Sequence, residues 1–65
     1  MKIDSVKIKI ILGGLNLSGK ELAEKIGVTP QNLSAILTRG SCHPKTAARI
    51  ARGLGVPVEE IIVKE

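Results

Sequence analysis

The chain has 65 residues, a length at which a domain buries only about 60% of the surface that its unfolded chain exposes. Its 43% hydrophobic and 25% charged residues are typical of a packed globular domain and exclude a disordered chain. The single cysteine excludes an internal disulfide, and no apolar run approaches the roughly 20 residues of a membrane span. A substrate pocket would be difficult to enclose at this length, so we expect a soluble cytoplasmic protein of one domain, residues 1–65, with no enzymatic activity.

The positive charge is unevenly distributed along the chain. The net charge is +4, and residues 28–58 contain no acidic residue but four basic ones: Arg39, Lys45, Arg49 and Arg52. The acids lie outside this stretch: Asp4, Glu21, Glu24, Glu59, Glu60 and Glu65. One contiguous half of the chain therefore has a field suited to a polyanion. A solvated basic surface without a ligand is the alternative that charge alone leaves open.

The first predicted element has two interpretations. In residues 6–10 apolar side chains alternate with lysines, as in a strand. A helix would instead place three apolar side chains on one face: Ile8, Ile11 and Leu12. Asp4 or Ser5 would cap this helix, and the two glycines at 13–14 would end it. We favour the helix because the chain offers no partner for a lone strand.

Two capped helices follow within residues 18–38. Ser18 and Glu21 form a capping box ahead of an apolar stripe, Leu22, Ala23 and Ile26. Gly27 ends this helix, and Thr29 with Pro30 begins the next one. In the helix that begins at Pro30, the third of the chain, the inward side chains are Leu33, Ile36 and Leu37. The outward ones are Gln31, Ser34, Ala35 and Thr38. Two helices joined by such a short turn constitute a helix-turn-helix, and a small residue at position 23 would let them cross closely.

Two further helices are predicted after residue 43. Pro44 begins a fourth helix that carries Ala47, Ala48, Ile50, Ala51 and Leu54 and stops at Gly55. Pro57 begins a short fifth helix with Glu59 and Glu60 at the end that the helix dipole favours for acids. The predicted fold class is all-α, a compact bundle of about five short helices.

A family resemblance is carried by two runs of sequence. Residues 17–37 read LSGKELAEKIGVTPQNLSAIL, and residues 48–62 read ARIARGLGVPVEEII. Together they resemble the Cro/CI, or xenobiotic-response-element (XRE), family of DNA-binding proteins over about residues 8–63. The stretch NLSAIL with HPKT downstream is also similar to the LacI-type headpiece. The resemblance implies a lambda-repressor-like domain that acts as a small stand-alone transcriptional regulator, a repressor, in a bacterium or phage. It also implies association with the nucleoid and no cofactor.

The resemblance further implies a role for individual residues. The third helix would enter the major groove of double-stranded DNA, with base-reading positions at Gln31, Ala35 and Pro30. Glutamine can bond an adenine edge through two hydrogen bonds, whereas alanine and proline offer no side-chain donor or acceptor. The positions that would meet phosphates are Lys20, Thr29, Asn32, Ser34, Thr38, Arg39, Ser41 and Lys45.

Besides Pro30 and Ala35, two further departures from the family pattern modify this expectation. Gly19 replaces a frequent glutamine, which removes a side-chain contact to phosphate. Leu12 and Leu37 stand where many relatives have a buried Arg–Glu pair, and such a replacement is often neutral or stabilising. We therefore expect phosphate contacts and DNA shape to supply most of the affinity, with Gln31 as the main direct reader.

Other functions have weaker support in the sequence. One cysteine and one histidine cannot complete a structural zinc site or a catalytic triad. The absence of aromatic residues disfavours binding of single-stranded DNA or RNA, which generally relies on stacking platforms. A homodimer is expected through the apolar C-terminal residues Ile61, Ile62 and Val63. The alternative is a protein-interaction module, such as an antitoxin or anti-repressor with the same fold.

Overall fold

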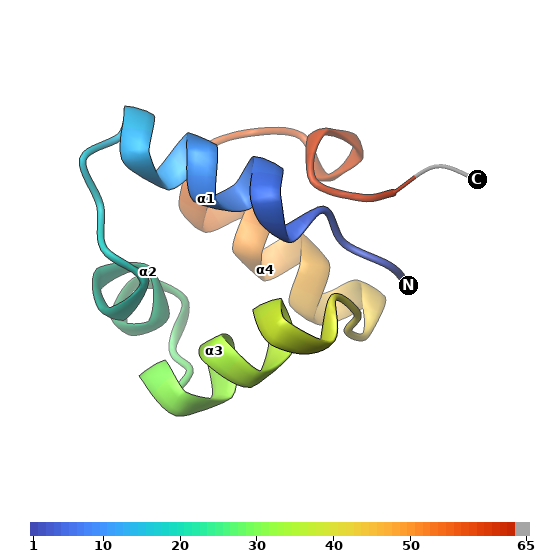
Figure 1. Cartoon of the computed structure of the whole chain (residues 1–65), viewed down its shortest axis with the longest axis horizontal. Helices are drawn as coiled ribbons and strands as arrows, with labels where there is room; N and C mark the ends of the chain where they lie inside the picture. The colour runs from blue at the N-terminus through green and yellow to red at the C-terminus, as the bar shows by residue number, and fades with distance from the viewer. Residues whose placement is uncertain (64–65) are drawn as a thin grey trace.

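The structure, a computed structural model, describes residues 1–63, in which four α-helices are followed by one 3-10 turn (Figure 1). These elements are α1 (Ser5–Gly14), α2 (Gly19–Ile26), α3 (Pro30–Arg39), α4 (Pro44–Leu54) and η1 (Val58–Glu60). The prediction of an all-α bundle is confirmed, but the fifth helix is only the single turn η1. It ends early because Ile61 turns into the core and Ile62 then pairs with Ile3 in an antiparallel bridge. No helix within residues 1–63 has the length and apolar character needed to cross a membrane.

The helical interpretation of the first element is confirmed. Asp4 is its N-cap, and its carboxylate accepts a hydrogen bond from the backbone N–H of Lys7 at 3.0 Å. The two glycines at 13–14 lie in the last turn rather than beyond it. The alternating pattern arose because Val6 and Ile10 are apolar but 68% exposed.

The turn between α2 and α3 has the predicted local chemistry. The hydroxyl of Ser18 accepts from the N–H of Glu21 at 3.1 Å, and the Glu21 carboxylate accepts from the N–H of Ser18 at 3.0 Å. Gly27 follows with φ 78°, a left-handed conformation that glycine adopts without steric cost. Thr29 then caps α3. Local hydrogen bonds therefore fix both ends of the turn and the start of α3.

The core receives side chains from every α-helix and from both terminal segments. Its buried members are Ile3, Ile8, Leu12, Leu22, Ala23, Leu33, Ile36, Ala47, Ile50, Ala51, Leu54 and Ile61. Ala23 is fully buried, as the predicted close crossing requires. A second close approach was not predicted: a Cβ at Gly53 would lie 2.5 Å from Cγ2 of Ile26 and 3.0 Å from Cδ1 of Leu22. The absence of a side chain at Gly53 thus lets α4 pack directly on α2.

Residues 1–4 form an extended segment between two other parts of the chain. The N–H of Ile3 donates to the carbonyl of Gly40 at 2.9 Å, and the N–H of Asp4 donates to that of Ile61 at 2.7 Å. Bridges join Lys2 to Ser41 and Ile3 to Ile62. The N-terminal segment therefore ties the turn after α3 to residues 61–63, and Figure 1 shows these segments on one side of the molecule.

Candidate nucleic-acid interface

The outer face of α3 is an open, shallow groove lined by both polar and small apolar side chains. Exposed side chains line it along the helix: Pro30, Gln31, Ser34, Ala35, Thr38 and Arg39. The opposite face of α3 buries Leu33 and Ile36 in the core. Because these inward residues recur at helical spacing, the residues between them are held outward on one stripe. The structure thus brings together all three predicted base-reading residues and three of the predicted phosphate contacts.

Two polar residues at the start of α3 have different surroundings. The hydroxyl oxygen of Thr29 accepts from the N–H of Asn32 at 3.1 Å, which leaves its hydroxyl hydrogen available to donate to an anion. The side chain of Asn32 faces a hollow on the α4 side of α3 rather than the outer groove. Arg39, Ser41 and Thr46 line this same hollow. Asn32 is therefore placed beside the turn that leads into α4.

The turn after α3 presents positive charge and backbone donors. The Nε–H of Arg39 donates to the carbonyl oxygen of Ser41 at 3.3 Å, which orients the guanidinium at the turn. His43, the N-cap of α4, makes no side-chain capping bond. The first helical bond comes from the N–H of Ala47, so the N–H groups of Lys45 and Thr46 precede it at the positive end of the helix dipole. With the exposed Lys45 side chain, this end of α4 is suited to a phosphate group.

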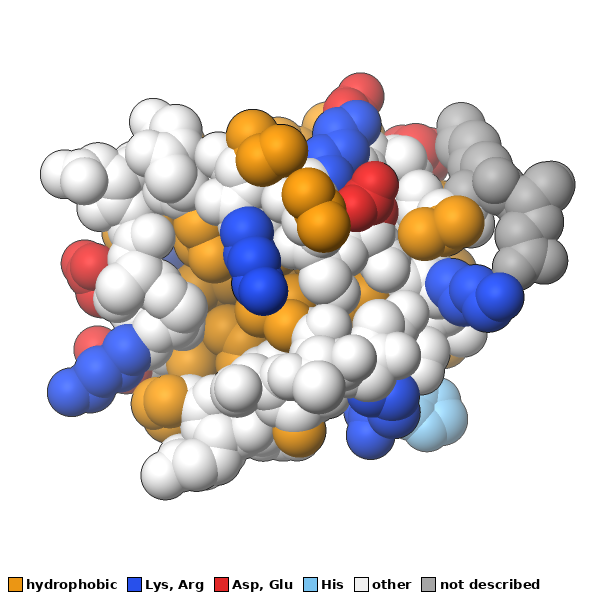
Figure 2. Space-filling model, viewed as in Figure 1, with side chains coloured by type: hydrophobic (Ala, Val, Ile, Leu, Met, Phe, Trp, Pro, Cys, Tyr) orange, Lys and Arg blue, Asp and Glu red, His pale blue; other side chains and the backbone are white. Residues whose placement is uncertain are grey.

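A second pair of cations lies on the opposite side of α3. Lys9 of α1 and Lys20 of α2 line a hollow of about 240 Å³ together with Ser34 and Thr38. Figure 2 shows this face, with hydrophobic side chains at the floor of the hollow between α1 and α3 and a basic side chain over it. Lys20 was predicted to meet phosphate, whereas Lys9 was not. No sequence signal identifies Lys9, because only the packing of α1 brings it beside α3.

The charged side chains around the outer groove of α3 are predominantly positive. Lys9 and Lys20 lie on one side of α3, Arg39 lines both the outer groove and the hollow on the α4 side, and Lys45 is exposed at the start of α4. Residues 28–58, which include all of α3 and α4, contain no acidic side chain. The acid nearest in sequence to Lys20, Glu21, is held by the capping box. Such a surface has a field suited to a polyanion.

The predicted dimer residues are only partly at the surface. Ile61 is fully buried in the core, because the 3-10 turn directs its side chain inward, so it is not an exposed contact as expected. Ile62 is half-buried, and Val63 is 45% exposed. Only these last two residues remain available to a second copy of the chain.

Cys42 lies in the turn before α4, and its surroundings do not activate it. Partial burial raises the pKa of the Cys42 thiol, and the positive charges of the amino terminus and of Arg39 oppose this shift only in part. Within the described residues no three His, Cys, Asp or Glu side chains gather where they could hold a metal ion. The interface around α3 is therefore the better-supported candidate site.

A family model described as Helix-turn-helix matches residues 8–61. The match runs from within α1 to the residue after η1 and includes every side chain of the outer groove of α3. No curated protein and no solved structure matches the chain.

Proposed function

The chain belongs to the XRE-type helix-turn-helix family, and on that premise we propose that it binds double-stranded DNA sequence-specifically as a small transcriptional repressor. The observation that carries this proposal is the outer face of α3, where Gln31 is exposed among small side chains with cations beside the groove. The alternative, a protein-interaction module, has less support because cations flank this face and residues 28–58 contain no acidic side chain.

The shape of α3 is suited to the major groove of DNA. An α-helix with its side chains is about 10–12 Å across, and the major groove is about 12 Å wide. Gln31 is near the start of α3, and its amide supplies the donor and acceptor that an adenine edge requires. Ala35 is one turn further along and offers a methyl group that fits the methyl of thymine. Gln31 is therefore the main direct reader, and the shape of the DNA supplies further discrimination.

The flanking residues are proposed to hold the two phosphate backbones. Lys9 and Lys20 contact one strand, and Arg39 and Lys45 contact the other. The hydroxyls of Thr29, Ser34, Thr38 and Ser41 and the amide of Asn32 add hydrogen bonds to phosphate oxygens. These contacts carry no sequence information, so they set the register in which Gln31 meets a base.

A homodimer completes the proposal. Two copies would meet through Ile62 and Val63 and would read half-sites about 34 Å apart, one turn of the double helix. We propose that such a dimer represses by occupying its operator in the cytoplasm, without enzymatic activity.

Selection from a random-sequence duplex library tests the proposal. The winning duplex and a scrambled version are then titrated with the protein between about 50 and 200 mM salt. We expect a palindrome to be selected, with a preference that persists as salt rises while binding to the scrambled duplex fades. Lys45→Ala should weaken binding to both duplexes equally. It should also reduce the slope of the logarithm of affinity against the logarithm of salt concentration by about 1. Weak and equal binding to every duplex, lost as salt rises, would overturn the proposal.

A further inference from the structure

A second basic surface lies away from the outer groove of α3. Lys25, Ile26 and Gly27 at the end of α2 and Arg49, Arg52 and Gly53 of α4 line an open hollow of about 480 Å³. We name it the α2–α4 hollow. It shares no residue with the three hollows that surround α3. A ligand in the α2–α4 hollow would therefore leave the outer groove of α3 accessible.

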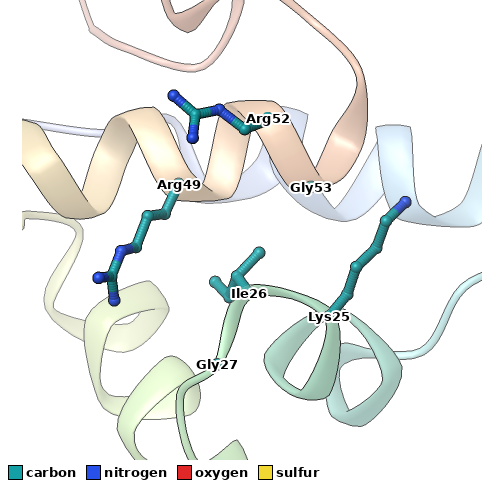
Figure 3. Close-up of a pocket in the computed structure, with 6 residues that line it drawn as sticks. All are labelled: Lys25, Ile26, Gly27, Arg49, Arg52 and Gly53. Atoms are coloured by element: carbon teal, nitrogen blue, oxygen red, sulfur yellow. The ribbon is translucent and has the colours of Figure 1, made fainter.

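The α2–α4 hollow has an apolar centre and a positively charged rim. Figure 3 shows Ile26 between α2 and α4, with Lys25, Arg49 and Arg52 extending around it in different directions. Ile26 is half-buried against the core, and all three cations are exposed. Within residues 1–63 none of the three forms an ion pair, and no acidic side chain lines the hollow. The positive charge of this rim is therefore not neutralised by any side chain in the described part of the protein.

The two glycines that line the hollow have different surroundings. Gly27 is exposed, and nothing lies within 4 Å of the place where its Cβ would be, so another chain can approach its backbone closely. Gly53 accommodates Cγ2 of Ile26, which holds that side chain at the centre. An apolar centre surrounded by a charged rim, with arginine in it, is the usual anatomy of a contact between proteins. A phosphate group, by contrast, could meet the cations of the rim but has no apolar surface to cover Ile26.

We propose that the α2–α4 hollow docks an acidic segment of a protein partner. An apolar side chain of that segment covers Ile26, and its Asp or Glu side chains lie against Lys25, Arg49 and Arg52. Complementary charge of this kind sets both the choice of partner and the rate of encounter. Because the hollow is separate from the outer groove, the partner and a DNA duplex bind at the same time.

A defined peptide tests this inference without knowledge of the natural partner. The probe has two central leucines with glutamates on both sides, and the control probe has lysine in place of each glutamate. Each is titrated into the ¹⁵N-labelled protein. We expect the glutamate peptide to shift the amide signals of residues 25–27 and 49–53, and the lysine peptide to shift none. Signals that shift along α3 instead would overturn the proposal.

Two matched variants separate a local site from a general effect of net charge. Arg49→Glu with Arg52→Glu should weaken binding of the glutamate peptide about tenfold or more. Lys9→Glu with Lys20→Glu makes the same change in net charge on the α1 side of α3. This variant should lose less than about twofold in affinity for the glutamate peptide. Equal losses in the two variants would overturn the proposal. Circular dichroism checks that both are folded, and R49Q/R52Q replaces the first pair if it is not.

A competition experiment with a random-sequence duplex distinguishes a protein site from an extension of the DNA interface. At 0.15 M salt, charges more than about 8 Å apart are largely screened, so the glutamate peptide should still bind in the presence of saturating duplex. The Lys9/Lys20 variant should lose more duplex affinity than the Arg49/Arg52 variant. The opposite result is that the duplex displaces the peptide and that the Arg49/Arg52 variant loses more duplex affinity than the Lys9/Lys20 variant. It would assign the hollow to DNA and overturn the proposal. The peptide titration requires no DNA binding. If the protein does not bind DNA, the titration still tests whether the α2–α4 hollow docks an acidic segment.

Discussion

The hydroxyl of Ser5 donates a 2.6 Å hydrogen bond to the carbonyl oxygen of Leu37. Leu37 lies in the last turn of α3, where carbonyl groups no longer find a donor within the helix. Asp4 caps α1, so the hydroxyl of Ser5 is available for this longer-range contact. The start of α1 thus holds the end of the helix that carries the outer groove.

Ser5→Ala tests the importance of this bond. It leaves the Leu37 carbonyl without its donor in a partly buried position, which costs about 1–2 kcal/mol. In a protein of this size each kcal/mol lowers the melting temperature by about 4–8 °C. Thermal unfolding followed by circular dichroism measures the change. Ser34→Ala is the control, because Ser34 is exposed on the outer face of α3; equal melting temperatures for the two variants would contradict the prediction.

Gly53→Ala is expected to lower the free energy of unfolding. The added methyl group would crowd Cγ2 of Ile26 and Cδ1 of the buried Leu22, so side chains or helices must shift. Overpacking of this kind costs about 1–3 kcal/mol, against the roughly 1 kcal/mol that alanine gains over glycine within a helix. Gly13→Ala is the matched control because a Cβ there meets nothing within 4 Å. Chemical denaturation should show a loss for the first variant and none for the second.

Gln31→Ala should reduce affinity for the selected duplex by about 1–3 kcal/mol, because the two hydrogen bonds to a base edge are lost. Binding to a scrambled duplex should hardly change. Asn32→Ala provides the contrast. The loss of a contact to phosphate should weaken binding to both duplexes equally. Fluorescence anisotropy measures the affinities of the wild type and both variants for each of the two duplexes. A Gln31→Ala loss of equal size on both duplexes would remove the assignment of this residue as a base reader.

Substitutions at the C-terminal end test the proposed homodimer. Val63→Glu places a charge at a half-exposed position, so the variant should be a folded monomer by sedimentation analysis. Ile62→Glu should behave in the same way if its exposed part meets the second copy. Ile61→Glu is expected to unfold the protein, because a charge without a partner would be buried. A wild-type protein that sediments as a monomer at the same concentration would contradict the dimer.

Cys42 is expected to react slowly with iodoacetamide. Burial raises the pKa of its thiol, so the reactive thiolate is scarcer near neutral pH than in an unfolded chain. The alkylation rate should rise with pH and should increase when the protein is unfolded in urea. A folded protein that reacts as fast as the unfolded one would show that burial does not protect this cysteine.

The α-helices and their caps could be predicted from the sequence because they depend on neighbours along the chain. Ser18 and Glu21 bond each other across three residues, and so do Thr29 and Asn32. The outward face of α3 followed from the spacing of Leu33 and Ile36, which also identified Gln31 as accessible. Local hydrogen bonds and helical periodicity were therefore sufficient for the helix-turn-helix and for the residues on its outer face.

Contacts between distant residues were decided by the tertiary structure alone. Ser5 and Leu37 are 32 positions apart, and no pattern in either segment indicates that they meet. The same holds for Lys9 beside α3, for Gly53 against Ile26 and for the burial of Ile61. Each depends on how helices pack around a shared core, where the positions of all the other side chains determine which surfaces face each other. The sequence by itself determined the helices and the face that α3 presents, while packing determined what lies beside that face.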